Sequence, residues 1–164
     1  MVPHFQGLGG VAMPDSRSPS DLLVAPLGAA DRADWELLAR GYKAFYREDI
    51  PDEDYARAWS RLRAGEEVHG LGARSGGRLI GIAHYLYHPH TWLGDVCYLQ
   101  DLFTAPEARG RGVAGALIEA VAEAARLRGA SRYYWLTQED NLPGRALYDR
   151  VARYHGFIRY DYPL

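Results

Sequence analysis

The pattern of hydrophobic and polar positions divides this chain into alternating strand-like and helix-like stretches. Ser75-Gly76-Gly77 connects two of the strands as in an antiparallel hairpin. Short apolar runs bounded by turn residues predict strands over residues 22–27, 68–74, 79–87, 96–104, 133–137 and 157–162. Apolar side chains at steps of three and four predict helices over residues 32–47, 51–64, 113–127 and 142–154. The order βααβββαβαβ predicts a mixed α/β (α+β) fold with helices on both faces of one sheet.

Composition sets bounds on this picture. The chain has 164 residues, which is enough for one domain with a single core. A net charge of -2 and an isoelectric point near 6.3 give no basic field, so neither nucleic acid nor a membrane surface is an expected partner. The single cysteine, Cys97, excludes an internal disulfide, and we interpret it as a small buried hydrophobe.

The N-terminal stretch differs from the rest of the chain. Residues 1–20 contain Gly, Pro and Ser without a hydrophobic period, and we interpret them as a disordered leader. Residues 21–164 are expected to form a single domain. No stretch is apolar enough to span a membrane and no signal-peptide pattern is present, so we expect a cytoplasmic protein.

The main chemical signal is the turn Arg109-Gly110-Arg111-Gly112-Val113-Ala114-Gly115, which lies between a strand and the most regular helix. Glycines allow the backbone to approach a ligand closely, and the first N–H groups of a helix lack internal partners. These groups lie at the positive end of the helix dipole and favour an anion, above all the pyrophosphate of a nucleotide-containing cofactor. The alternative is a glycine-rich turn that serves only tight helix packing.

The same turn permits a second interpretation. Gly110, Gly112 and Gly115 also fit the dinucleotide-binding pattern G-x-G-x-x-G, with Glu139 as a ribose-binding acid. The position of the turn argues against a dinucleotide-dependent oxidoreductase, because it occurs late in the chain and only one βα unit follows it. No G-K-[ST] sequence follows either, which excludes a P-loop nucleotide hydrolase.

Two segments share their spacing with a known protein family. Residues 109–114 match the signature Q/R-x-x-G-x-G/A, and the strand Tyr-Leu-Gln-Asp-Leu-Phe at 98–103 precedes them. Residues 141–148, followed by Gly156-Phe157, match the stretch N…A-x-x-x-Y…G-F. These features resemble the GNAT superfamily of N-acetyltransferases, and most closely its diamine, thialysine and histone-type members. The resemblance implies a mixed, mostly antiparallel sheet of about six or seven strands, with acetyl-CoA as the acyl donor.

The resemblance also implies how acetyl-CoA is held. Backbone N–H groups of the glycine turn take the pyrophosphate, and its two arginines meet the phosphates, unless one of them is a solvated surface charge. The main chain of the preceding strand pairs with the pantetheine arm and donates to the thioester carbonyl. Asn141, two helical turns before Tyr148, is expected to hydrogen-bond the pantetheine or a cofactor amide. The expected cofactor-binding residues are Leu102, Phe103, Thr104, Arg109, Gly110, Arg111, Gly112, Val113, Ala114, Gly115 and Asn141.

Tyr148 is the candidate general acid. A phenol with a pKa near 10 stays protonated at neutral pH and can protonate a departing thiolate whose thiol has a pKa of about 8.5. Gln100 stands where relatives often carry a glutamate, and an amide accepts no proton from an ammonium group. The general base that deprotonates the acceptor amine is therefore not assigned. A water relay assisted by Glu48 or His84 is one option, and an acceptor amine that arrives neutral needs no base. Asp101 is expected to be structural, since regular alternation places it on the other strand face from Gln100.

The acceptor that the resemblance implies is a primary amine, in a small amine, an amino acid or a lysine side chain. Five acids within residues 48–54 attract a cationic amine or, equally, complement the start of a helix. An alternative function is a non-catalytic acyl-CoA sensor, which Gln100 in place of an acid favours. A homodimer is a further expectation, because apolar surface on the last strand suits one. His84, His88 and His90 suggest a metal site, but no acid or cysteine completes a ligand set and no metal is expected.

Overall fold

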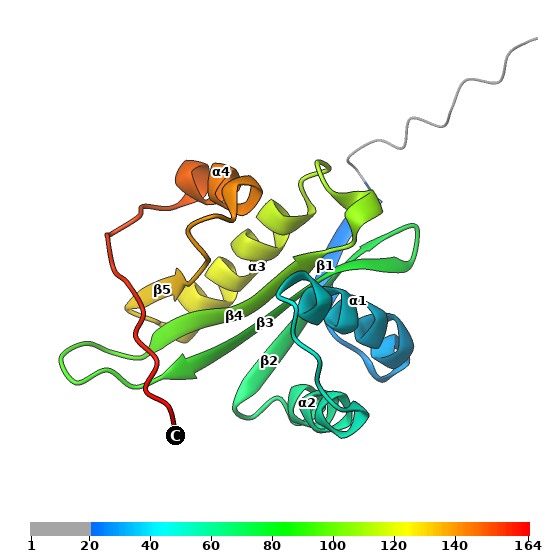
Figure 1. The fold of residues 1–164 in the computed structure, drawn as a ribbon, viewed down its shortest axis with the longest axis horizontal. Helices are drawn as coiled ribbons and strands as arrows, with labels where there is room; N and C mark the ends of the chain where they lie inside the picture. Colours follow the sequence, from blue (N-terminus) through cyan, green and yellow to red (C-terminus); the bar gives the residue numbers. More distant parts are fainter. Residues whose placement is uncertain (1–20) are drawn as a thin grey trace, which may run out of the picture.

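The computed structural model describes residues 21–164 as one sheet with helices on both faces (Figure 1). The five strands of this part are β1 (Leu22–Pro26), β2 (Val68–Ser75), β3 (Arg78–His88), β4 (Val96–Thr104) and β5 (Arg132–Trp135). The helices are α1 (Arg32–Phe45), α2 (Asp52–Ala64), α3 (Val113–Arg128) and α4 (Leu142–Val151), with short 3-10 turns η2 (Ala29–Asp31) and η3 (Pro106–Ala108). The leader expected over residues 1–20 lies outside the described residues.

The sheet is mixed and mostly antiparallel, as the sequence predicts. Its order is β1-β2-β3-β4-β5, and each of the first three strands pairs antiparallel with the next. β5 joins β4 in parallel, after the chain has passed through α3. A parallel neighbour requires such a crossover, whereas the β2–β3 hairpin closes through the short predicted turn. The predicted fold class is thus confirmed, although the number of strands differs.

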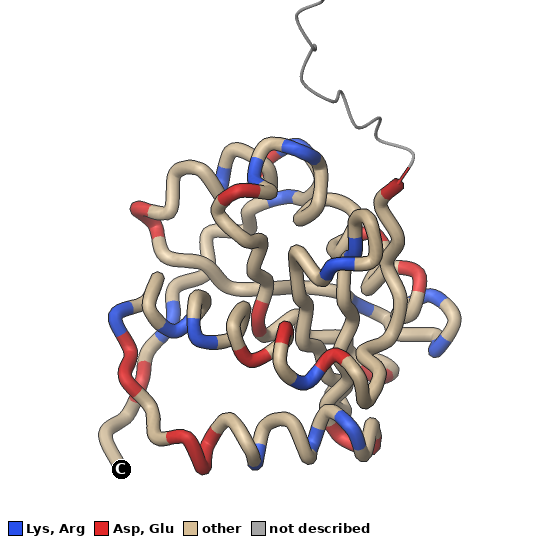
Figure 2. The backbone as a smooth tube through the Cα atoms, turned by 90° about the vertical axis from the view of Figure 1, so that its right-hand side faces the viewer, with Lys and Arg blue, Asp and Glu red and all other residues tan. Residues whose placement is uncertain are grey.

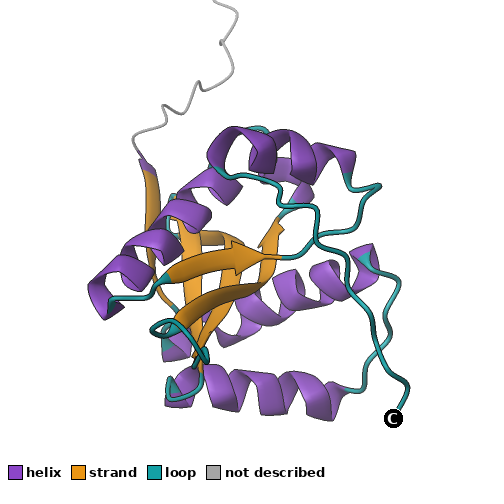
Figure 3. Cartoon of the chain, turned by 90° about the vertical axis from the view of Figure 1, so that its left-hand side faces the viewer, coloured by secondary structure: helices purple, strands orange, loops and turns teal. Residues whose placement is uncertain are grey.

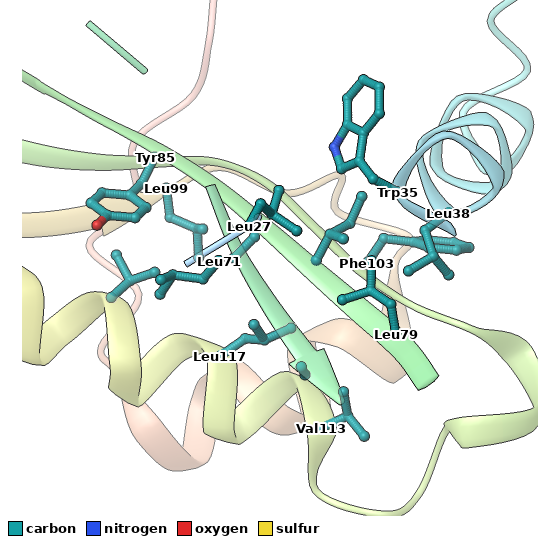
Figure 4. Close-up of a cluster of buried hydrophobic side chains, with 14 of the residues drawn as sticks. Leu27, Trp35, Leu38, Leu71, Leu79, Tyr85, Leu99, Phe103, Val113 and Leu117 are labelled. Atoms are coloured by element: carbon teal, nitrogen blue, oxygen red, sulfur yellow. The ribbon is translucent and has the colours of Figure 1, made fainter. Parts of the chain in front are cut away.

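Helices α1 and α2 cover one face of the sheet and α3 covers the other (Figure 3). Figure 4 shows Trp35 and Leu38 reaching the core from α1, and Val113 and Leu117 reaching it from α3. The fit on the α3 side is tight, because a Cβ at Gly81 of β3 would lie 2.7 Å from the Val113 side chain. Trp35 and Leu117 are almost completely buried. The core therefore lies on both faces of the four antiparallel strands.

β4 carries a β-bulge at Gln100. His84 of β3 pairs with Asp101 and Tyr85 pairs with Leu99, so Gln100 has no partner across this ladder. Directly paired residues share a face, and a bulge shifts the alternation of faces by one residue. Asp101 therefore shares a face with His84 on the α1 side, while Leu99 shares the α3 side with Tyr85. The exposed Gln100 side chain lies at the point where the alternation of side chains between the two faces shifts by one residue.

β4 also extends beyond its neighbour β5. The parallel ladder ends where Leu99 pairs with Trp135, but β4 continues to Thr104. Within residues 21–164, the far side of β4 has no strand partner over residues 100–104. Because β5 is shorter than the predicted strand over residues 133–137, the two strands leave an open edge between them.

The sixth predicted strand does not form, and this corrects the expectation of six or seven strands. The helix α4 ends at Val151 and not at Tyr154, and residues 152–164 belong to no helix or strand. Figure 1 shows this red segment running from α4 past the β5 end of the sheet to the C-terminus. A strand needs hydrogen-bond partners along its backbone, and in this part of the chain no neighbouring strand supplies them.

Charges of both signs are interspersed over the face that Figure 2 presents. This mixture agrees with the small net charge of the chain. No helix in the described part is long and apolar enough to cross a membrane. Among the same residues, no three His, Cys, Asp or Glu side chains gather as they would around a metal ion.

Candidate active site

The turn before α3 presents unpaired backbone N–H groups. Gly110 (φ 73°) and Gly112 (φ 80°) adopt left-handed conformations that favour glycine. The first backbone hydrogen bond of the helix runs from the Ala116 N–H to the Gly112 carbonyl at 3.0 Å. The N–H groups of residues 113–115 come before it and therefore have no acceptor within the helix. Within residues 21–164, no side chain caps this helix start. A Cβ at Gly110 or Gly112 would meet nothing within 4 Å, and this open space beside a helix N-terminus fits a phosphate group.

Two arginines add positive charge to the turn. Arg109 and Arg111 are both exposed. The Arg109 guanidinium carbon lies 5.9 Å from the centre of the Phe103 ring, which holds this side chain near the end of β4. Guanidinium groups beside free backbone N–H groups strengthen the attraction for an anion.

The open edge of β4 leads directly to this turn. Ala105 donates its N–H to Ile80 of β3 at 2.9 Å. Because N–H groups alternate in direction along a strand, Leu102 and Thr104 direct theirs away from β3, on the side that β5 does not reach. The Thr104 hydroxyl is buried and has no hydrogen-bond partner in the described part of the chain. An extended ligand that lies along this edge would satisfy these groups.

Tyr148 lies where β4 and β5 separate. Its ring contacts that of Trp135, the last residue of β5, edge-on at 5.4 Å between centroids. Burial raises the pKa of the Tyr148 phenol, and the nearby Tyr46 phenol adds to this rise. A group that keeps its proton at neutral pH therefore lies at the opening between the two strands.

Asn141 caps the helix that carries Tyr148. Its side-chain oxygen accepts from the Gly144 N–H at 3.2 Å, and its side-chain nitrogen donates to the Thr137 hydroxyl at 2.9 Å. A Cβ at Gly144 would approach the Asn141 side chain to 2.5 Å, so the cap depends on glycine there. Asn141 precedes the helix and does not lie on its face. Its expected contact with the cofactor stays a prediction.

A buried chain of hydrogen bonds lies beside the bulge. The Trp35 Nε1–H donates to His84 Nε2 at 2.9 Å, and His84 Nδ1 lies 2.9 Å from Asp101 Oδ2. An indole N–H can only donate, so Nε2 is the accepting nitrogen and the proton on Nδ1 is donated to the carboxylate. Both ring nitrogens of His84 are thus engaged inside the protein. This leaves Glu48 as the remaining expected helper of a proton relay.

Asp101 is held in its ionised form. Burial acts to raise the pKa of this carboxyl, but the hydrogen bonds from His84 and Tyr42 and the nearby charge of Lys43 lower it below its ordinary value. Burial and the Asp101 charge in turn raise the pKa of Tyr42 and of Tyr46. A general base works best with a pKa near the working pH. The lowered pKa therefore favours the structural role expected for Asp101.

Tyr46 is a neighbour of Tyr148 that the sequence analysis does not include among the candidate site residues. It lies at the end of α1, four residues after Tyr42, and the two rings meet edge-on at 5.1 Å between centroids. The available signal is this spacing of four residues, which places both rings on one helix face. Tyr46 lies close enough to Tyr148 in the folded chain to raise the pKa of its phenol, although the two residues are about a hundred positions apart in the sequence.

The acids between α1 and α2 are largely paired. Glu48 contacts Lys43 at 2.5 Å, and Asp52 contacts Arg40 at 2.6 Å. Asp54 pairs in addition with a neighbouring arginine. Asp52, Glu53 and Asp54 also lie in the first turn of α2, where acids complement the helix dipole, and this is the alternative role expected for the group. Attraction of a cationic amine by the group stays a prediction.

Comparison with known proteins agrees with this geometry. Residues 35–154 match the Acetyltransferase (GNAT) family. Over 144 residues, 85% of this chain and 89% of the relative, the chain is 31% identical to the D-amino-acid N-acetyltransferase HPA3 of Saccharomyces cerevisiae. Over 84 residues, 51% of this chain and 52% of the relative, it is 36% identical to the thialysine N-epsilon-acetyltransferase of Caenorhabditis elegans.

Solved structures share the fold. The ribosomal-protein-alanine N-acetyltransferase from Brucella melitensis biovar Abortus 2308 superposes with a TM-score of 0.72 and 24% identity, covering 87% of this chain and 99% of that one. The structure of AAC(6')-Iy in complex with a bisubstrate analog of CoA superposes with a TM-score of 0.78 and 18% identity, covering 87% and 97%. The chain belongs to the GNAT family of acetyltransferases, enzymes that take the acetyl group from acetyl-CoA.

Proposed function

We propose that this enzyme transfers the acetyl group of acetyl-CoA to a small primary amine, and that amino acids are the first class of acceptor. Two relatives support this choice, because they are named for D-amino acids and for thialysine. A lysine side chain in a peptide is the second class of acceptor that the family allows. The small net charge and the paired acids between the helices offer no strong attraction for a highly cationic partner.

One observation carries the proposal: the free N–H groups of residues 113–115 continue the open edge of β4. Acetyl-CoA combines an extended pantetheine arm with a pyrophosphate, and it supplies an activated acetyl thioester when bound. In our proposal the outward N–H groups of Leu102 and Thr104 hold the arm. The unpaired Thr104 hydroxyl and the space beside Gly112 fit the same ligand.

Tyr148 acts as the general acid in this scheme. The acceptor nitrogen forms a bond to the acetyl carbon, the carbon–sulfur bond breaks, and Tyr148 donates its phenolic proton to the sulfur. The raised pKa of Tyr148 keeps this proton in place at neutral pH until the thiolate develops. The contact with Trp135 and the Asn141 cap hold the phenol in position.

Removal of the proton from the incoming ammonium is assigned to water. Gln100 is exposed at the bulge, but an amide cannot accept this proton. Asp101 is a weak base because its pKa is lowered, and both nitrogens of His84 are engaged. Glu48, half-exposed beside Lys43, is the carboxylate that assists such a relay. With this arrangement the rate rises with pH as more of the acceptor amine is neutral.

A matched pair of glycine variants tests the cofactor site. Gly112 and Gly129 lie at opposite ends of α3, both have positive φ, and a Cβ at either would meet nothing within 4 Å. Gly112→Glu is expected to abolish binding of CoA in calorimetry, because it brings a like charge to the pyrophosphate position. Gly129→Glu introduces the same backbone strain and the same charge at the other end of α3, away from the site. This variant should bind CoA like the wild type. Equal binding by Gly112→Glu and the wild type would place the cofactor elsewhere.

The exposed Gln100 also supports a second candidate, a sensor that binds acyl-CoA without turnover. Release of free CoA thiol separates the two functions. D-amino acids, thialysine, diamines and lysine peptides are each incubated with enzyme and acetyl-CoA. Steady thiol release with any of them supports the enzyme, whereas tight cofactor binding with no release from the whole panel favours the sensor.

A further inference from the structure

His84 differs in kind from the core in which it lies. Apart from hydrophobic residues and glycine, it is the only buried residue in the described part of the chain. Its neighbours on β3, Ala83 and Tyr85, are both hydrophobic and buried. A buried polar side chain is a poor source of stability, because it must be desolvated, but it can specify one register over another. The position of His84 therefore points to a role in the pairing of β3 with β4.

The bulge of β4 directly opposite His84 has a register that needs to be specified. His84 pairs with Asp101, Tyr85 pairs with Leu99, and Gln100 is the extra residue between them. If the extra residue lay one position later, Gln100 would pair with His84 and Asp101 would take the exposed position. Both arrangements leave one residue of β4 without a partner, so the backbone ladder alone does not choose between them.

Side-chain hydrogen bonds select the observed register. His84 Nδ1 donates to Asp101 Oδ2 at 2.9 Å, and Tyr42 of α1 donates to the same carboxylate. The His84 ring is fixed at its other nitrogen, because Trp35 is 1% exposed and donates to Nε2 at 2.9 Å. A donor binds an ionised carboxylate more strongly than a neutral amide, so Asp101 is preferred over Gln100 opposite His84.

The same contacts fasten β4 on both sides of Leu102. Asp101 before it is held by His84, and Phe103 after it packs closely on α1, since a Cβ at Gly41 would lie 2.9 Å from the Phe103 ring. Leu102 carries the first N–H after the bulge that points away from β3. The register of the bulge therefore determines where this N–H stands along the open edge.

We propose that His84 is a positioning residue for acetyl transfer: through Asp101 it fixes the bulge of β4, so that the Leu102 N–H meets the carbonyl of the acetyl thioester. This inference rests on the proposed function, because it needs the thioester to lie along the open edge of β4. In this role neither His84 nor Asp101 touches the reacting atoms. The pyrophosphate is held separately at the start of α3, so loss of the register should lower turnover and leave the affinity for CoA unchanged.

Two substitutions of His84 separate positioning from stability. His84→Asn places an amide nitrogen near the position of Nδ1 and can still donate to Asp101, but it loses the bond from Trp35. His84→Gln reaches the position of Nε2 and can accept from Trp35, but it no longer donates to Asp101. Each variant loses one buried hydrogen bond, so both should show a similar fall in melting temperature.

Their kinetics should differ. We expect kcat to fall about ten- to a hundredfold in His84→Gln, because the thioester is misplaced, and by less than about threefold in His84→Asn. Calorimetry should give both variants the wild-type affinity for CoA. Equal kcat values in the two variants, or a lower value in His84→Asn than in His84→Gln, overturn the proposal.

Infrared spectroscopy of acetyl-CoA labelled with 13C at the carbonyl measures the hydrogen bond itself. A donated hydrogen bond weakens the C=O bond and lowers its stretching frequency. The band should lie at the same low frequency in complexes with the wild type and His84→Asn, and at a higher frequency with His84→Gln. One frequency in all three complexes overturns the proposal, whatever the kcat values are.

Asp101→Asn provides a test that does not require His84→Gln to fold. This variant keeps an oxygen for the His84 N–H but loses the charge, so kcat should fall by less than about threefold. A fall of tenfold or more would mean that Asp101 acts through its charge, and the proposal would be wrong. A wild type without thiol release from any acceptor contradicts the proposed function and this inference together, whereas an active wild type with equally active His84 variants contradicts only this inference.

Discussion

The sheet has two halves that are built differently. The closed half consists of β1 to β4 with α1, α2 and α3, where each antiparallel pair runs along most of its strands and helices pack on both faces. The open half consists of β5, α4 and residues 152–164. Here β5 pairs through four residues, and α4, which the structure describes completely, has no fully buried residue, although Leu147 and Tyr148 are partly buried against the core. The closed half is a complete core, whereas the open half has little core of its own.

This difference agrees with where we propose that the chemistry takes place. Unpaired polar groups are costly in a closed core, so they persist where a ligand or a partner can satisfy them. Along the boundary of the two halves lie the outward N–H groups of Leu102 and Thr104 and the free start of α3. Tyr148 faces the same boundary from α4. The proposed site therefore lies between a well-packed half of the sheet and a half with few buried residues.

The largest expected effect concerns stability, and it compares one leucine from each half. Leu117 is fully buried in the closed half, and Leu142 of α4 is 68% exposed. Leu117→Ala is expected to lower the free energy of unfolding by about 2–5 kcal/mol, because it leaves a cavity between α3 and the sheet. Leu142→Ala should change it by less than about 0.5 kcal/mol. Urea unfolding measures both, and similar losses for the two variants would erase the distinction between the halves.

The second effect concerns turnover and should separate it from stability. Tyr148→Phe removes the proposed acid, and kcat is expected to fall about a hundredfold, equivalent to ~2.7 kcal/mol. The affinity for CoA and the melting temperature should change little, because the ring still packs on Trp135. Tyr154→Phe, at an exposed tyrosine just beyond α4, is the control and should keep full turnover. An unchanged kcat in Tyr148→Phe removes this residue from the acid role.

The two halves also differ in how well the sequence predicts them. Helices and the β2–β3 hairpin follow local patterns, such as the spacing of apolar positions before Gly65 and the turn Ser75-Gly76-Gly77, and these predictions are confirmed. The glycine turn also lies at the start of α3, as its sequence predicts. The last strand over residues 157–162 was predicted from alternation alone, and it lacks a neighbour in the single chain. The strand with which a segment pairs lies elsewhere in the chain, so the sequence of the segment alone does not identify it.

The candidate site shows the same limit. The bulge at Gln100 depends on how β3 and β4 pair, and no residue type in β4 predicts a shift of one position. Without it, Asp101 would lie on the opposite face from His84, and the hydrogen-bond chain to Trp35 would not form. The influence of Tyr46 on Tyr148 likewise depends on the folded chain, because the two residues are distant in sequence. Residue types thus suggest candidate groups for the site, but they do not predict the contacts between these groups.

A third effect, smaller again, depends on pH. In the closed half Asp101 has a lowered pKa, so the folded state favours its ionised form and this stability is fully present above the ordinary value of 3.8. Asp101→Asn keeps an oxygen for His84 but loses the charge, and it should cost about 1–2 kcal/mol at pH 7. The difference from the wild type should shrink as the pH falls below 3.8, through the lowered native pKa. Unfolding in urea across pH 7 to 3 measures this.

An aspartate of the open half provides the control for that pH series. Asp149 of α4 is exposed, and Asp149→Asn should leave both the stability and its pH dependence close to those of the wild type. If Asp101→Asn differs from the wild type by the same amount at every pH, the loss comes from packing. The charge of Asp101 would then contribute nothing to folding.

The smallest effect is a gain in stability at the border of the closed half. Arg47 has φ 57°, the one non-glycine residue with positive φ in the described part. It ends α1 in a turn where the Glu48 N–H donates to the Lys43 carbonyl at 3.0 Å and the Arg47 N–H donates to that of Ala44 at 3.1 Å. Glycine is the favoured residue at this position, because it has no Cβ to strain the left-handed conformation.

Arg47→Gly should therefore raise the free energy of unfolding by about 0.5–1 kcal/mol, measured in urea. Arg47→Ala is the matched control, since it removes the guanidinium group but keeps a Cβ in the strained conformation, and it should give no such gain. An equal gain from alanine would assign the effect to the lost charge. If only Arg47→Gly stabilises the protein, the natural Arg47 stores backbone strain at the border of the closed half. This residue directly precedes Glu48, which we propose assists the proton relay.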